Sequence, residues 1–102
     1  MQEFITAHRD EIAELCRRHH VRRFSVFGSA VRDDFDPENS DVDVRVEFAP
    51  EALDDYIHHI HTLHDALVAM FGRKVDLLTT PTISNQFFRK ELEETQVTLY
   101  AA

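Results

Sequence analysis

The stretch VFGSAVRDDFDPENSDVDVRV, residues 26–46, decides the fold that we expect for this chain. It opens at the end of a short apolar strand, residues 22–27, which stops at Gly28, and a loop of turn-forming residues follows. From Asp41 onward, valines alternate with charged side chains. Because successive side chains of a strand point to opposite faces, this alternation predicts a half-buried strand with its valines inward and its charges outward.

Helical and strand patterns surround this stretch. Apolar residues spaced three to four apart predict an amphipathic helix over residues 3–19. A second helix of roughly 20 residues should begin at Pro50 and end at Gly72. Leu53 and Ile57 belong to its apolar stripe. The remaining segments are a strand at residues 74–79, a helical stretch from Pro81 and Thr82 to about Glu94, and a last strand at residues 96–100. This order predicts an α/β or α+β fold, a small sheet with helices covering one face.

The totals of the sequence limit the class of protein. With 102 residues, 43% of them hydrophobic and 29% charged, the chain suits a single globular domain, residues 1–102. No apolar run approaches the roughly 18 residues of a membrane span, and Cys16 stands alone, which fits a reducing, cytoplasmic location. The net charge of −8 argues against direct binding to nucleic acid, because that binding depends on Lys and Arg neutralising phosphates.

Asp41 and Asp43 are candidate metal ligands. They stand two residues apart on the expected strand, so both side chains leave one face with Cβ atoms about 6–7 Å apart. Two such carboxylates can lean together and share hard cations such as Mg²⁺, which prefer oxygen ligands. The alternative is an ordinary solvated strand face, since a single alternating strand is a weak signal.

Asp76 is a third candidate, because it interrupts the run Val75–Leu78, which predicts a core strand. A buried, unpaired carboxylate costs several kcal/mol, so Asp76 would need a partner. A metal ion shared with Asp41 and Asp43 would be one such partner. On the alternative interpretation, Asp76 lies on the open face of its strand and pairs with an arginine.

Gly28 and Ser29 supply a candidate phosphate site. A glycine that ends a strand allows a sharp turn and lets a phosphate approach where a Cβ would stand. The N–H groups at the start of the following helical turn favour an anion, and the Ser29 hydroxyl adds a donor. In most proteins a lone Gly-Ser pair is only a turn. Beside the aspartates, however, it predicts one site for the phosphates and the Mg²⁺ of a nucleoside triphosphate.

Together these residues resemble the nucleotidyltransferase superfamily of DNA polymerase β. The shared pattern is Gly28-Ser29-x-x-Arg32, then Ser40-Asp41-x-Asp43 on a strand, then Asp76 on another strand. The resemblance covers nearly the whole chain, and the small size points to the minimal nucleotidyltransferase (MNT) group. It implies a small mixed β-sheet flanked by helices, the nucleotidyltransferase-like fold. It also implies transfer of a nucleoside monophosphate, usually from ATP, to a hydroxyl, with release of pyrophosphate.

The resemblance also implies roles for individual residues. The nucleotide-binding residues would be Gly28, Ser29, Arg32 and Ser40, and the residues that are both catalytic and metal-binding would be Asp41, Asp43 and Asp76. Asp41 and Asp43 would hold two Mg²⁺ ions, and Asp76 would ligate the catalytic ion and help to activate the attacking hydroxyl. Arg32 is assigned either to phosphate or to the structure of the site.

This chain departs from the family pattern at two positions. Val31 and Asp33 stand where members often have alanine and glycine. A larger side chain and an added charge beside the phosphates bear directly on the geometry of the turn and on the affinity for a triphosphate.

The MNT group also implies a partner. Its members often stand beside a HEPN-type ribonuclease toxin, transfer AMP to a tyrosine of that toxin and so act as its antitoxin. The acidity of this chain would suit a basic, RNA-binding partner. Two alternatives remain open. One is a non-enzymatic antitoxin that only covers the toxin, which Val31 and Asp33 would favour, and the other is a nucleotidyltransferase for RNA or a small molecule.

Two further groups of residues have open interpretations. His58, His59, His61 and His64 lie on the long helix, where His61 and His64 are spaced to ligate Zn²⁺ or to form part of a solvated face. The pair at residues 87–88, Phe-Phe, should dock the last helix onto the sheet, whereas an exposed phenylalanine there would contact a partner.

Overall fold

A computed structural model describes residues 1–32, 35–79 and 84–102. Its centre is a four-stranded sheet with the strand order β3-β2-β1-β4. The strands are β1 (Val21–Phe27), β2 (Val42–Phe48), β3 (Val75–Thr79) and β4 (Val97–Ala101). β1 runs antiparallel to both of its neighbours, β2 and β4, whereas β2 and β3 run parallel. The sheet is therefore mixed, as expected, and the alternating valines form its second strand.

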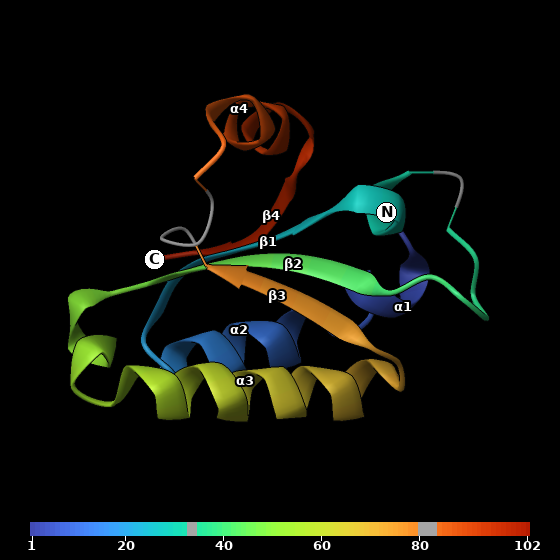
Figure 1. Cartoon of the computed structure of the whole chain (residues 1–102). Helices are drawn as coiled ribbons and strands as arrows, with labels where there is room; N and C mark the ends of the chain where they lie inside the picture. The colour runs from blue at the N-terminus through green and yellow to red at the C-terminus, as the bar shows by residue number, and fades with distance from the viewer. Residues whose placement is uncertain (33–34, 80–83) are drawn as a thin grey trace.

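Helices flank both faces of this sheet. They are α1 (Glu3–Thr6), α2 (Arg9–Arg18), α3 (Tyr56–Phe71) and α4 (Gln86–Thr95), together with the 3₁₀ helices η1 (Gly28–Val31) and η2 (Pro50–Asp55). Figure 1 shows α2 and α3 beneath the sheet and α4 above it. The expectation that the helices cover one face was therefore wrong. Phe27 and Leu78 explain the difference, because they pack with Leu92 of α4 in a second, smaller core.

The main core lies between the sheet and the pair α2 and α3. Val42, Val44 and Val46 are completely buried there, as their alternation predicted. Their partners in this core include the buried residues Ile5, Ile12, Cys16, Phe24, Val26, Leu63 and Leu67. Each fully buried aliphatic or aromatic side chain contributes roughly 1.5–3 kcal/mol to folding. Burial raises the pKa of the Cys16 thiol to about 12, which keeps it protonated and unreactive.

Both long helices were predicted with the wrong extent. The helix expected over residues 3–19 is divided into α1 and α2, and the segment that begins at Pro50 is a 3₁₀ helix before α3 starts. A 3₁₀ helix has about three residues per turn, so the apolar stripe changes its direction. Leu53 and Ile57 are each 67% exposed as a result and do not join the core. Gly72, with a left-handed φ of +65°, ends α3 as predicted.

The upper face of the sheet is more covered than the sequence suggested. Arg45 was expected to face solvent, yet it is only 4% exposed. Its Nη1 donates a hydrogen bond to Oε1 of Gln96 (3.3 Å), and its Nη2 lies 4.0 Å from Oε1 of Glu47. Gln96 joins α4 to β4, so the same segment that places α4 over the sheet also covers and pairs this guanidinium.

A side-chain cap fixes the start of α4. The Oδ1 atom of Asn85 accepts hydrogen bonds from the backbone N–H groups of Phe87 (2.9 Å) and Phe88 (3.1 Å). Pro81 and Thr82, where the sequence placed this start, lie outside the described residues. Phe88 contacts Phe27 with ring centroids 6.3 Å apart, but Phe87 is 76% exposed. The prediction that both phenylalanines dock onto the sheet was therefore wrong for Phe87.

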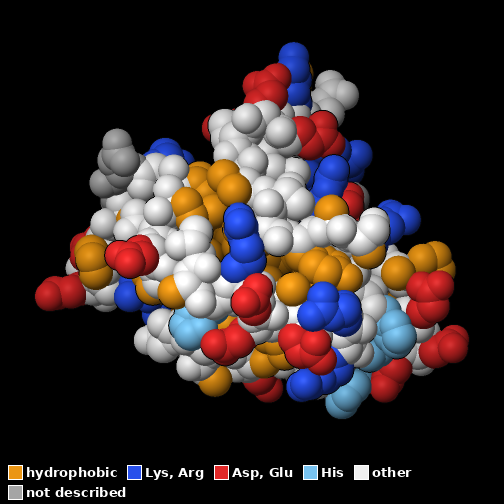
Figure 2. Space-filling model, turned by 180° about the vertical axis from the view of Figure 1, so that it is seen from behind, with side chains coloured by type: hydrophobic (Ala, Val, Ile, Leu, Met, Phe, Trp, Pro, Cys, Tyr) orange, Lys and Arg blue, Asp and Glu red, His pale blue; other side chains and the backbone are white. Residues whose placement is uncertain are grey.

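The surface mixes acidic and basic side chains. Figure 2 shows them interspersed on the back of the molecule, around hydrophobic side chains that gather near the middle. Within the described ranges, no helix is both long enough and apolar enough to cross a membrane.

Candidate functional site

The predicted aspartates meet where β2 and β3 begin. In the parallel pairing of these strands, Asp43 is the register partner of Asp76. Asp41, which directly precedes β2, is held by Lys74, whose Nζ lies 3.7 Å from Oδ2 of Asp41. The backbone carbonyl of Lys74 also accepts the N–H of Val42 at 3.1 Å. The strand order thus brings together carboxylates that are distant in the sequence.

The electrostatics of this corner are dominated by crowded negative charge. The pKa of Asp43 is raised to about 6, first by partial burial, then by the charge of Asp76 and a hydrogen bond with its carboxyl group, and then by the charge of Asp41. The Arg32 guanidinium opposes this rise. A carboxylate in such a place favours either a proton or a cation beside it.

Asp76 is exposed, so the expectation of a buried carboxylate in a core strand was wrong. Asp76 lies near the start of β3, whereas Leu78, two residues further along the same face, packs against the cluster of Phe27 and Leu92. The alternative interpretation correctly placed Asp76 on an exposed face. The interaction found for Asp76 there is with Asp43.

The donors fit a hard divalent cation in kind and in charge. Carboxylate oxygens are the ligands that Mg²⁺ prefers. Partial burial, followed by the charges of Asp76 and Asp41, raises the pKa of Asp43, and a cation beside these carboxylates would offset this effect. Across residues 1–32, 35–79 and 84–102, no three carboxylate, imidazole or thiol groups already converge as a metal cage. The aspartates would therefore have to close around an ion when it binds.

Gly28 is required by the close approach of Asp43. Its φ of +70° lies in the left-handed region that favours glycine. A Cβ placed on Gly28 would also collide with Oδ2 of Asp43. The glycine turn therefore lies directly against the carboxylate. The half-buried Ser29 follows in η1, where its carbonyl accepts the N–H of Arg32 at 3.1 Å.

The two remaining predicted nucleotide-binding residues have different surroundings. The exposed Arg32 lines a hollow together with Gly28 and Asp43. Ser40 instead closes the loop that leads into β2. Its Oγ accepts the N–H of Asp36 at 2.9 Å, and its own N–H donates to the carbonyl of Asp36 at 2.8 Å. The structure thus gives Ser40 a part in shaping the loop that delivers the aspartates.

The sequence analysis missed Arg73, which fixes the same loop. Its guanidinium lies over the rings of Phe4 and Phe35, 4.6 and 5.0 Å from their centroids, and donates to the carbonyl of Pro37 at 2.9 Å. Each cation–π contact of this kind is worth about 0.5–2 kcal/mol. Arg73 thus holds the loop at Pro37, and the adjacent Lys74 holds the Asp41 carboxylate, both at the start of β3. No local pattern in the sequence marks this arginine.

Helix α4 forms a wall of the site that the sequence analysis also missed. A hollow of about 250 Å³ is lined by Phe27, Gly28, Arg32, Asp43, Phe88, Glu91, Leu92 and Thr95. An adjoining hollow of about 370 Å³ is lined by Gly28, Val31, Arg32, Glu91 and Thr95. Only tertiary packing decides which face of α4 turns toward the aspartates, so helical periodicity alone gave no signal for this wall.

Of the two residues that depart from the family pattern, Val31 lies within the described part of the chain. Val31 packs against the main core and lines the larger of the two hollows, so the fold accommodates its extra bulk. Asp33 lies outside the described residues.

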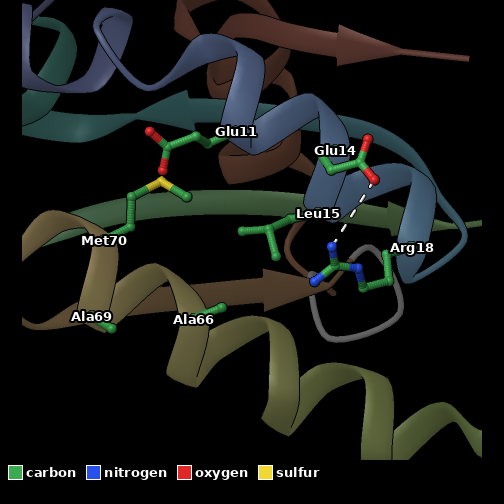
Figure 3. A pocket seen from close by; sticks show the side chains of 7 residues that line it. All are labelled: Glu11, Glu14, Leu15, Arg18, Ala66, Ala69 and Met70. Carbon is green, nitrogen blue, oxygen red and sulfur yellow. Dashed lines mark ion pairs between the residues drawn. The ribbon is translucent and has the colours of Figure 1, made fainter.

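A larger groove lies elsewhere, between α2 and α3 (Figure 3). It measures about 530 Å³ and is lined by Glu11, Glu14, Leu15, Arg18, Ala66, Ala69 and Met70. At its rim, Nη2 of Arg18 lies 4.0 Å from Oε1 of Glu14. None of the predicted site residues lines this groove.

Comparison with known proteins gives a consistent result. The family model for the nucleotidyltransferase domain matches residues 9–98. The protein adenylyltransferase MntA of Thermococcus cleftensis is 34% identical over 94 residues, which cover 92% of this chain and 88% of that protein. A Methanocaldococcus jannaschii protein, provisionally named a protein adenylyltransferase, is 32% identical over 92 residues, covering 82% of this chain and 90% of that protein.

Solved structures share the fold. A protein provisionally named a minimal nucleotidyltransferase superposes with a TM-score of 0.79 at 27% identity, covering 93% of this chain and 92% of that one. A toxin–antitoxin structure with AMP-PNP gives 0.67 at 20% identity, covering 92% and 73%. A tri-AMPylated HEPN toxin of Shewanella oneidensis in complex with its MNT antitoxin gives 0.64 at 18% identity, covering 95% and 72%. The expected nucleotidyltransferase-like fold is confirmed.

Proposed function

This chain belongs to the nucleotidyltransferase domain family, and from that membership we propose that it transfers AMP from ATP to a protein hydroxyl and acts as an antitoxin. The acceptor in this proposal is a tyrosine of a HEPN-type toxin. Two kinds of likeness support it. Relatives above 30% identity carry the name protein adenylyltransferase. Proteins with the same fold stand in toxin–antitoxin structures, one with AMP-PNP and one with an AMPylated HEPN toxin.

The observation that carries the proposal is the pairing of Asp43 with Asp76 against the turn at Gly28. Asp41, Asp43 and Asp76 would hold two Mg²⁺ ions, which supply positive charge against the phosphates when they are bound. The triphosphate would lie at Gly28, Ser29 and Arg32. Arg32 lines the same hollow as Gly28 and Asp43, and its charge opposes the rise in the pKa of Asp43.

The proposed transfer conserves atoms and charge. The acceptor oxygen forms a bond to the α-phosphorus, the bond from that phosphorus to the bridging oxygen of the β-phosphate breaks, and pyrophosphate leaves. The proton of the acceptor hydroxyl passes to the carboxylate of Asp76. Because Asp76 is exposed on an edge strand, a hydroxyl carried by a second protein can reach it.

The surface beside the site suits a protein acceptor. Phe87 is a large exposed apolar residue, and the adjacent Phe88 lines the same hollow as Asp43. In this proposal, Phe87 would contact the protein acceptor. The net charge of −8 complements a basic toxin that binds RNA.

The test is transfer of label from ATP to the toxin encoded beside this chain. Wild type with Mg²⁺ should label a toxin tyrosine, and the double variant Asp41→Asn/Asp43→Asn should not. Asp65→Asn is the matched control, since it makes the same chemical change at an exposed position on α3. Equal labelling by wild type and double variant would refute the enzymatic proposal.

Two other outcomes would contradict one part of the proposal, either the enzymatic mechanism of protection or the identity of the acceptor. If Asp43→Asn neutralises the toxin as well as wild type does at the same dose, the chain protects by binding alone. If RNA or a small molecule is labelled when no toxin is present, the acceptor is wrong although the reaction class is right.

A further inference from the structure

Four histidines gather at the end of the sheet opposite to the aspartates. His19 and His20 directly precede β1, and His58 and His59 lie in the first turn of α3. β1 begins beside them, and its last residue pairs with Asp43 at the other end. Six steps along a strand span about 20 Å, so this group is well separated from the candidate active site.

The ring of His59 lies at the centre of the group. Its centroid is 5.3 Å from that of His19, 5.6 Å from that of His20 and 5.9 Å from that of His58. The Nδ1 atoms of His19 and His59 face each other at 3.0 Å. One of these nitrogens must carry a hydrogen that the other accepts. The two imidazole nitrogens therefore point at each other.

This spacing is close to that of two ligands on one metal ion. Zinc–nitrogen bonds of about 2.0–2.1 Å in a tetrahedral shell place two ligand nitrogens about 3.3 Å apart. The two Nδ1 atoms would have to separate by a few tenths of an ångström, and the rings would have to turn so that both lone pairs meet at an ion beside the line between the nitrogens. The hydrogen of the donating Nδ1 would move to Nε2 of the same ring.

The chain around these rings fixes where two of them lie. His19 is buried, only 6% exposed. His20 has a left-handed φ of +58°, and its carbonyl accepts the N–H of Ala49 at 2.8 Å. This sharp turn places two adjacent imidazoles beside α3.

We propose that His19 and His59 bind a divalent transition-metal ion, of which Zn²⁺ is the best match to imidazole ligands. In the part of the chain that the structure describes, no third donor already converges with this pair. The third ligand comes from rotation of an exposed ring, that of His20 or His58, and water completes the shell. The ion would tie the end of α2 to the start of α3.

The sequence also offers a different pair, His61 and His64. The structure engages Nε2 of His64 with the carbonyl of Val75 at 2.9 Å, so this nitrogen is already occupied. His61 therefore serves as a control residue on the same helix. Figure 2 shows histidine side chains at the lower right of the back surface, among acidic and basic neighbours.

Calorimetric titration of Zn²⁺ into the untagged chain tests the proposal. The titration uses the Asp41→Asn/Asp43→Asn/Asp76→Asn background, so that none of the three proposed catalytic carboxylates can supply the signal. We expect one ion per chain. His59→Gln should weaken Zn²⁺ binding at least about tenfold, because even the loss of a residue that only supports a metal ligand lowers affinity by that much. His61→Gln should bind as the parent does. Co²⁺ in place of Zn²⁺ should give a visible absorption band that His59→Gln lacks.

A second variant separates loss of ligands from loss of fold. His20→Gln/His58→Gln alters only exposed side chains and should also weaken binding while the circular dichroism spectrum is unchanged. Absence of binding up to millimolar Zn²⁺ would overturn the proposal. So would unchanged affinity in His59→Gln, or equal losses in His59→Gln and His61→Gln. AMP transfer is not measured in this experiment, so its outcome is independent of the proposed function.

Discussion

Replacing Asp43 with asparagine should stabilise the metal-free protein near neutral pH. In the folded chain the pKa of Asp43 rises from 3.8 to about 6, chiefly through burial and then through the charge of Asp76. Above pH 6 the folded protein must therefore ionise a carboxyl group in a place that favours its neutral form. Asparagine has nearly the same shape and no charge. Asp43→Asn thus removes a cost in stability while it should also abolish AMP transfer.

The change in pKa sets an upper limit on this effect. A rise from 3.8 to about 6 corresponds to roughly 3 kcal/mol, at about 1.4 kcal/mol for each tenfold change in proton affinity. Asp43 is partly exposed, and solvent screening reduces the interaction with its neighbours. We therefore expect Asp43→Asn to raise the free energy of unfolding by on the order of 1 kcal/mol at neutral pH. For a domain of this length, that corresponds to about 4–8 °C in Tm.

The dependence of stability on pH shows the sign of the effect of Asp43→Asn and gives a way to measure it. A group with a raised pKa contributes stability that is present below 3.8 and lost as the pH rises through about 6. Wild type should lose stability across this window, and Asp43→Asn should not lose it. Urea unfolding in EDTA, followed by circular dichroism at a series of pH values, measures the difference. Added Mg²⁺ should narrow the gap at neutral pH, because it stabilises wild type preferentially.

Asp36→Asn is the matched control for this experiment. The pKa of Asp36 is lowered, first by a hydrogen bond from the Asn39 side chain and then by one from the backbone N–H of Glu38. Its replacement should therefore destabilise the protein at neutral pH, in the opposite direction. The reasoning is refuted if Asp43→Asn destabilises the metal-free protein above pH 6. It is also refuted if the advantage of this variant persists unchanged below pH 3.8.

Two further predictions use paired positions. Gly28→Ala should abolish AMP transfer, because its Cβ would displace the Asp43 carboxylate. Gly72→Ala has the same backbone strain but meets no atom within 4 Å, so it should lose about 1–2 kcal/mol of stability and keep its activity. Equal activity losses in the two variants would exclude the collision as the cause. Phe87→Ser should change the free energy of unfolding by less than about 0.5 kcal/mol while it weakens toxin binding in calorimetry. Ile57→Ser, at a similarly exposed apolar position on the opposite side of the sheet, should change toxin binding little, and equal effects of the two variants would contradict a contact at Phe87.

Alternation along a strand predicted the direction of side chains better than it predicted their burial. It correctly separated Val42, Val44 and Val46 from the charged residues of β2. Alternation also expected Arg45 in solvent, and the apolar run around Asp76 expected that carboxylate in the core, but the structure buries Arg45 and exposes Asp76. β2 is a central strand that α4 covers, whereas β3 is an edge strand. Burial thus depends on strand order and on the placement of α4, and neither is encoded within a single strand.

The sequence predicts those residues of the candidate site whose type has a specific chemical role. Carboxylates at Asp41 and Asp43 and a glycine at the end of β1 are unusual enough to be noticed in the sequence. The structure then places Gly28 against Asp43, and this contact explains why that position cannot carry a side chain. The sequence does not distinguish Glu91 and Thr95, which line the same hollow, from other polar residues of a surface helix. They line the site only because α4 crosses the upper face.

The contacts of Arg73 have a consequence for the way in which related sequences can differ. This arginine joins Phe4 in α1, Phe35 and Pro37 in the loop, and the start of β3. Losing one ring weakens the hold of the guanidinium on the other, and an insertion in the loop moves the Pro37 carbonyl out of reach. We therefore expect covariation at these positions, so that relatives without the arginine also lack the aromatic pair. The loop before the aspartates should be inherited together with a distant helix and strand, as one evolutionary unit.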